Sequence, residues 1–253
     1  MPHDTVWLDR MTSPQVREAI ENGYHTVLMA VGSTEQHGPH LPLGTDSLIG
    51  DKLVERIAQK LGKTLVAPTV RVGVSEHHMA FAGTMTVRSE VLEEYLVDCC
   101  RSLARHGFRT IVLIPTHGGN VETILRTAKR LERESLSAKV PAQLDESAYL
   151  TAVVEVGSKY DLTPGQVGTH AGHLETSSIL ADYPGLGDME KATCGRVDLG
   201  SHVHDKLHEV GMHNLSPVGI LGDATGSSAE AGREYNECMA KVIAEQIRKV
   251  IGG

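Results

Sequence analysis

Apolar residues recur along this chain with two different periods. Short apolar, β-branched runs predict buried strands, and apolar positions spaced three and four apart predict helices. Strands are expected at residues 109–115, 25–31 and 64–72, the last interrupted by Pro68, with 139–144 as a further candidate. Helices are expected at residues 46–61, 91–105, 120–134 and 227–251, with Ser89 as the N-cap of the second.

This alternation of strands and helices is typical of βαβ units that build a mostly parallel sheet. The sequence therefore predicts an α/β protein, and 253 residues suffice for one large domain or two small ones. In such sheets the ligand site lies just beyond the carboxyl ends of the strands. We expect the loops that follow residues 31 and 115 to open on the same rim.

Composition and charge narrow the function classes. The content of 40% hydrophobic and 22% charged residues is ordinary for a globular protein, and a net charge of −8 without a Lys/Arg stripe argues against nucleic-acid binding. We see no signal peptide and no apolar run that could span a membrane. The four cysteines, Cys99, Cys100, Cys194 and Cys238, form no C-x-x-C pair, so we expect a cytoplasmic protein without disulfides.

The loop after the first strand carries a dense group of possible metal ligands. Residues 32–46 include Glu35, His37, His40 and Asp46. In an extended segment residues i and i+2 point the same way, so Glu35 and His37 can reach one centre or two adjacent ones. Asp46 can bridge two centres with its carboxylate oxygens, whereas a simple helix N-cap is the alternative. Beside Glu35 and His37, metal binding is the favoured interpretation.

Two later loops carry further ligand-type residues. His117 follows the third strand and precedes Gly118 and Gly119, which permit close approach of the backbone; an incidental histidine in a turn is the alternative. Residues 170–177 contain two histidines, each a possible ligand, base or proton donor. In the same segment Glu175 lies near a helix start, where complementing the helix dipole is the alternative.

A fourth loop, residues 74–84, contains Glu76, His77 and His78 and is interpreted as a substrate loop, with a polar surface turn as the alternative. The remaining histidines are interpreted as surface or core residues: His3, His25, His106, His202, His204, His208 and His213. No Gly-x-Ser-x-Gly elbow, phosphate-binding Gly-x-x-x-x-Gly-Lys-Ser/Thr loop or His-Glu-x-x-His helix is present. Metal-activated water is the chemistry that remains.

The motifs together resemble a known family. Residues 32–46 read Gly-Ser-Thr-Glu-Gln-His-Gly-Pro-His-Leu-Pro-Leu-Gly-Thr-Asp, which resembles the signature of the creatininase (creatinine amidohydrolase-like) family, and the segments 76–84, 117–120 and 170–177 resemble its later motifs in the same order. The resemblance implies a single domain over residues 1–253, a three-layer αβα sandwich, usual assembly as a homo-hexamer, and two divalent metal ions (zinc, manganese or iron). It implies metal ligation by Glu35, His37, Asp46 and His117, with Asp46 bridging, and a role for His170 in handling protons or substrate.

The chain departs from creatininase itself in two places. There the histidine corresponding to His117 is followed by Tyr-Glu, and that glutamate is a ligand, whereas Gly118 and Gly119 follow here. We expect Glu175 to complete the second metal shell, and also assign it a catalytic role, with Glu122 as the second choice. Creatininase also uses tryptophans around its substrate, whereas the one tryptophan here, Trp7, lies outside every matched motif. Creatinine is therefore not the expected substrate.

The resemblance implies hydrolysis of a small, cyclic substrate by metal-activated water at a carbonyl, with C–N bond cleavage as the leading hypothesis. In this hypothesis His170 protonates the leaving group, and Glu76, His77 and His173 bind substrate. The alternative is C–C bond hydrolysis of an oxidised inositol (3-dehydro-scyllo-inosose-type), because a pocket with His77, His78 and His173 suits a polyol ring. A metal-holding protein without turnover is the third hypothesis.

Overall fold

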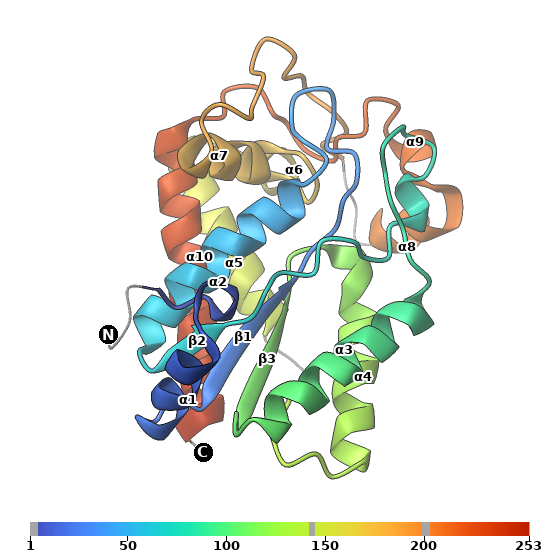
Figure 1. Cartoon of the computed structure of the whole chain (residues 1–253). Helices are drawn as coiled ribbons and strands as arrows, with labels where there is room; N and C mark the ends of the chain where they lie inside the picture. The colour runs from blue at the N-terminus through green and yellow to red at the C-terminus, as the bar shows by residue number, and fades with distance from the viewer. Residues whose placement is uncertain (1–4, 142–144, 199–202, 253) are drawn as a thin grey trace.

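A three-stranded parallel sheet organises the fold (Figure 1). The computed structural model describes residues 5–141, 145–198 and 203–252. The strands lie in the order β2-β1-β3 and comprise β1 Thr26–Val31, β2 Thr64–Val66 and β3 Thr110–Pro115. Thr26 pairs with Thr64 on one side and with Thr110 on the other. The prediction of an α/β fold with a parallel sheet is confirmed.

Helices cover both faces of this sheet and produce three layers (Figure 1). One face is covered by α1 Ser13–Glu21, α3 Ser89–Arg105 and α4 Val121–Arg133. The opposite face is covered by α2 Thr45–Leu61, α5 Glu146–Ser158, α7 His173–Asp182 and α10 Ala229–Gly252. Short helices occupy the connections: η1 Leu8–Arg10, η2 Glu76–His78, η3 Gly118–Asn120, α6 Pro164–Val167, α8 Val203–Val210 and α9 Met212–Leu215.

The alternation of side chains along β1 explains the layers. Every residue of β1 is buried. Leu28 and Ala30 belong to the apolar cluster shared with α2 and α10, whereas Val27 and Met29 belong to the cluster shared with α3 and α4. Because successive side chains of a strand point to opposite faces, an uninterrupted apolar run is what a strand covered on both faces requires.

Most predicted elements are found, with shifts at their ends. Strand β2 ends at Val66, short of the predicted residue 72, because Pro68 cannot donate to a ladder. Ser89 was expected as an N-cap but is the first helical residue of α3, and Arg88 is the N-cap. Lys139 forms only an isolated bridge to Thr110, and residues 142–144 of the candidate fourth strand lie outside the described residues, as does His202.

The long helix α10 fastens the second helical layer. It packs against α2, α5 and α7, and Gly232 lies where a Cβ atom would overlap the carbonyl oxygen of Ser177 on α7. Only glycine allows this approach of the two helices. Within the described ranges no helix is both long and apolar enough to cross a bilayer. The four cysteines are free, as expected.

The loops after β1 and β3 meet on one rim, as predicted. Asn120, at the end of η3, is fully buried and donates from its side-chain amide to the carbonyl oxygens of Val31 (3.1 Å) and Gly32 (2.9 Å). Its Oδ1 accepts from the backbone N–H of Val74 (3.0 Å). One side chain therefore ties together three of the four loops that carry the ligand-type residues.

Candidate metal centre

Five ligand-type side chains converge below this rim. Glu35 and His37 come from the loop after β1, Asp46 from the first turn of α2, His117 from the loop after β3, and Glu175 from the first turn of α7. The first four are buried, with residue exposures of 0–7%, and the Glu175 side chain is 19% exposed. The structure therefore brings together every residue for which metal ligation is expected from the sequence.

Asp46 divides this cluster into two halves. Its Oδ1 lies 3.1 Å from His37 Nε2, and its Oδ2 lies 3.2 Å from His117 Nδ1. We name the set Glu35, Asp46 and His117 the Glu35 half, and the set His37, Asp46 and Glu175 the Glu175 half. Within each half, one ligand atom from every residue lies within 4.8 Å of the others.

The distal nitrogens of the two histidines are occupied by the backbone. His37 Nδ1 donates to the carbonyl oxygen of Glu35 (3.1 Å), and His117 Nε2 donates to that of Val74 (2.9 Å). Neutral imidazole has one N–H, so each ring turns a bare nitrogen towards carboxylate oxygens. Lone pairs facing lone pairs repel unless a cation lies between them, and metal-binding histidines are oriented in this way.

Unpaired carboxylate oxygens lead to the same conclusion. Both carboxylate oxygens of Glu35, together with Asp46 Oδ2, are buried without a hydrogen-bond partner in the described part of the chain. A buried anion without a donor is costly, and a coordinated cation removes that cost. Carboxylate oxygens and imidazole nitrogens are a suitable donor set for zinc, manganese or iron, so the residues fit a two-metal centre.

The pKa shifts of the candidate ligands also indicate that this buried cluster needs positive charge. Burial alone would lower the pKa of His37, but Asp46, Glu175 and Glu35 raise it to about 9. The pKa of His117 is likewise raised, because Glu35 and Asp46 outweigh its burial. Burial raises the pKa of Glu175 to about 7, with the charge of Asp46 adding to the effect. Without metal, protons therefore neutralise the cluster, and metal binding displaces them.

His170 lies at the edge of the cluster with a fixed orientation. Its Nε2 donates to the carbonyl oxygen of Gln36 (2.9 Å), and its Nδ1 lies 3.6 Å from Glu35 Oε1. Burial lowers the pKa of His170, and the nearby His37 and His78 lower it further. The imidazole is therefore neutral and presents a bare Nδ1 to the centre.

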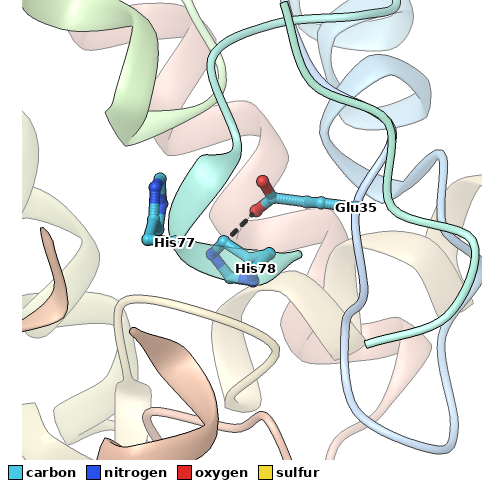
Figure 2. A group of neighbouring side chains, drawn as sticks. All are labelled: Glu35, His77 and His78. Atoms are coloured by element: carbon cyan, nitrogen blue, oxygen red, sulfur yellow. Dashed lines mark ion pairs between the residues drawn. The ribbon is translucent and has the colours of Figure 1, made fainter. Parts of the chain in front are cut away.

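The substrate loop reaches the centre through its histidines (Figure 2). His78 Nε2 lies 3.4 Å from Glu35 Oε1, and the His78 Nδ1 accepts from the Gln36 side-chain amide (2.8 Å). His77 is stacked on His117, with ring centroids 5.7 Å apart. Glu76 is exposed at the start of η2. Of the two histidines, His78 makes the closer contact with the ligands, although only its neighbour was selected as a site residue from the sequence.

Two other expected residues point elsewhere. His173 Nδ1 lies 3.2 Å from the hydroxyl of Tyr235 on α10, so this side chain belongs to the α7–α10 contact and does not face the ligands. Glu122, the second choice for the second shell, has an 83% exposed side chain paired with Arg126 (3.0 Å). Glu175 instead is held towards the centre by the backbone N–H of Ala171 (2.6 Å), a residue with a positive φ of 51°.

His208 is exposed, in agreement with its interpretation as a surface or core residue, but its contact with the substrate loop was not predicted. Its ring contacts that of His77 edge-on, with centroids 4.6 Å apart, although 131 positions separate the two in the chain. No spacing signal connects residues so distant, so only the fold reveals this contact.

A cavity of about 260 Å³ adjoins the centre. Its near end is formed by His117, Gly118 and Glu175, and its walls come from β3, α2, α4, α5, α7 and α10. It lies along β3, which is an edge strand of the sheet. A molecule bound at its near end therefore lies next to His117 and Glu175.

Comparisons with known proteins assign the family. The sequence model described as creatinine amidohydrolase matches residues 9–247. The chain belongs to the creatininase family. A mycofactocin precursor peptide peptidase of Mycolicibacterium smegmatis is 32% identical over 229 residues, covering 88% of this chain and 84% of the relative. A 3-dehydro-scyllo-inosose hydrolase of Thermotoga maritima is 28% identical over 97% of this chain and 84% of the relative.

Solved creatininase structures confirm the fold. A Zn-Zn form and a manganese form each superpose with a TM-score of 0.78 at 25% identity, covering 99% of this chain and 100% of theirs. The expected αβα sandwich of the creatininase family is thereby confirmed. The relatives are hydrolases with different named substrates, so membership of the family supports a hydrolase without selecting the substrate.

Proposed function

We propose that this protein is a metal-dependent hydrolase that cleaves the C–N bond of an amide. The observation that supports this most strongly is the Asp46 carboxylate, which presents one oxygen to each half of the centre. Glu35, Asp46 and His117 would hold one divalent ion, and His37, Asp46 and Glu175 the other. Two such ions, when bound, polarise a carbonyl and activate water.

His170 supplies the proton transfer that amide cleavage requires. Its Nδ1 faces the centre as an acceptor, so it takes a proton from the attacking water and gives it to the nitrogen as the C–N bond breaks. The products are a carboxylic acid and an amine. The Gln36 carbonyl oxygen accepts from the Nε2–H and holds the ring in this orientation throughout. Glu35, 3.6 Å away, stabilises the protonated ring between the two transfers.

Amide cleavage is favoured over C–C cleavage by the surroundings of the centre. The argument for a polyol ring requires His77, His78 and His173 in one pocket, but His173 contacts Tyr235. The wall of the adjoining cavity is largely apolar, which does not suit a polyhydroxylated ring. The relative at 32% identity is named as a peptidase, which also cleaves a C–N bond.

Metal analysis combined with an assay panel tests the proposal. We expect the protein purified without chelator to carry up to two equivalents of transition metal, and Glu35→Gln to lose metal and amine release together. The matched control is Glu122→Gln, an exposed carboxylate on α4 that should change neither. A metal-free wild type that still hydrolyses amides contradicts the proposal. Ring-opened acid from oxidised inositols, without amine release from any amide, supports the C–C alternative instead.

A further inference from the structure

The cavity beside the centre is apolar along most of its length. Leu113 lies on β3, Val121 and Leu125 on α4, Val153 on α5, and Met239 on α10. Val153 and Met239 are only 2–3% exposed, so this part of the wall belongs to the core, whereas Leu150 is 44% exposed. Protein cores are close-packed, and an apolar cavity of this size is a cost to stability unless something fills it.

The far wall of the cavity is firmly built. Asp145, which precedes α5, donates its backbone N–H to Gln246 Oε1 (2.7 Å), and Gln246 Nε2 donates back to the Asp145 carbonyl oxygen (3.1 Å). The Tyr149 hydroxyl lies 3.3 Å from the sulfur of Met239. These contacts fasten α5 to α10, and both helices line the cavity.

Two adjacent glycines at the near end differ in what they leave open. A Cβ atom at Gly119 would overlap the Val74 carbonyl oxygen and crowd the His117 ring, so packing alone requires glycine there. A Cβ atom at Gly118 would meet nothing within 4 Å, and Gly118 lines the cavity. No steric contact demands glycine at position 118, and its missing side chain keeps the passage beside His117 wide.

The position of His170 indicates which side of the substrate faces the cavity. His170 serves the leaving nitrogen and lies against Gln36 and His37, and it is not among the residues that line the cavity, although Gly168 and Thr169 before it are. The cavity instead begins at His117 and Glu175. With the scissile carbonyl at the centre and its nitrogen towards His170, the acyl side of the substrate faces the cavity.

We propose that this cavity is the binding site for a bulky apolar side chain on the acyl side of the scissile amide. The substrate class is then a peptide-type amide whose carbonyl belongs to a large aliphatic or aromatic residue. This inference rests on the proposed function. The volume of about 260 Å³ lies just below that of sites for small organic molecules, which suits one large side chain. Burying such a side chain strengthens binding by roughly 10- to 100-fold.

Kinetics with N-acetyl-leucinamide, N-acetyl-phenylalaninamide and N-acetyl-glycinamide test this inference on the metal-loaded protein. We expect kcat/KM to be at least roughly tenfold higher for the two bulky substrates. Gly118→Val should lower kcat/KM for the bulky substrates about tenfold more than it lowers kcat/KM for the glycine substrate. Gly185→Val is the control, because a Cβ atom at Gly185 also meets nothing within 4 Å and Gly185 lies outside the cavity lining. If Gly118→Val fails to fold, Val121→Phe fills the same space from α4.

Calorimetric binding of N-acetyl-phenylalanine and N-acetyl-glycine to the protein separates this inference from the proposed function. Tighter binding of the phenylalanine probe, lost in Gly118→Val, supports the subsite even if no amide is hydrolysed, a result that would overturn the proposed function alone. Equal kcat/KM for all three amides, or an equal effect of Gly118→Val on each, overturns the subsite while amide hydrolysis stands.

Discussion

The two halves of the candidate metal centre differ in depth and in the elements that support them. The Glu35 half is closed, since the side chains of Glu35, Asp46 and His117 are 0–5% exposed and come from elements next to the sheet. In the Glu175 half one ligand, Glu175, comes from α7. Its side chain is 19% exposed and lies beside the cavity. The Glu35 half is therefore the more deeply buried of the two, although its His117 also lines the cavity.

Replacing Asp46, the ligand that both halves share, should affect the two halves alike and cause the largest loss of metal and activity. In Asp46→Asn both halves lose an anionic oxygen, so we expect loss of both ions and a fall in kcat on the order of 10³-fold. Metal content by mass spectrometry and amide hydrolysis measure this. Retention of two tightly bound ions would show that Asp46 does not bridge the halves.

Changing Glu175, the partly exposed ligand, should affect only the Glu175 half. Glu175→Gln removes the charge from the Glu175 half only, so we expect one equivalent of metal to remain and activity to fall about 100-fold. Metal stoichiometry after gel filtration checks the result. Loss of both equivalents would mean that the Glu35 half cannot hold an ion alone.

Removing the Asn120 side chain, which links the loops of the Glu35 half, should have the next largest effect. Asn120→Ala leaves the Val74 N–H and two carbonyl oxygens without their partner, which costs about 1–3 kcal/mol of unfolding free energy. Because the Val74 carbonyl oxygen also orients His117, we expect an ion in the Glu35 half to bind about tenfold more weakly. Urea unfolding and metal titration measure the two effects. Asn236→Ala, a buried asparagine on α10, should reduce stability without changing metal affinity.

Acid should weaken the support of the Glu175 half, with the smallest effect. His40 Nε2 lies 2.8 Å from the hydroxyl of Thr176, which is next to Glu175 in α7. Burial, with the charge of His37, lowers the pKa of His40 from 6.5 to about 4. A lowered histidine pKa means that the unfolded chain binds the proton first, so this stability is complete above pH 6.5 and is lost as the pH falls towards 4.

Urea unfolding of the metal-free protein between pH 7.5 and 5 measures this loss. We expect the unfolding free energy of the wild type to fall by at most about 1.4 kcal/mol per pH unit below 6.5 relative to His40→Gln. His106→Gln, which removes an exposed histidine, should follow the wild type. Parallel pH profiles for the wild type and His40→Gln would exclude this role of His40.

The contrast between the halves also explains what the sequence could predict. Each half takes two ligands from the loop after β1 and the start of α2, and the halves differ in the third ligand, which is His117 or Glu175. Glu175 required the motif order as well, since an acid in a first helical turn has an ordinary explanation. His173 was misjudged because residues two apart on a helix point about 200° apart, so it faces Tyr235 while Glu175 faces the centre.

Other features depend on contacts that no local pattern contains. Glu76 and His78 belong to the same short turn, and only the packing of η2 shows which of them is buried. The contact between His77 and His208 joins distant segments. The cavity is formed by β3 and several helices together, so the apolar residues that line it are indistinguishable in sequence from ordinary core positions.

Helix α10 places the completion of both halves at the end of synthesis. It packs against α2, which carries Asp46, and against α7, which carries Glu175, and it is the last helix in chain order. Chains are made from the N-terminus and tend to fold in that direction. We therefore expect a growing chain to hold its ions firmly only after this C-terminal helix has docked.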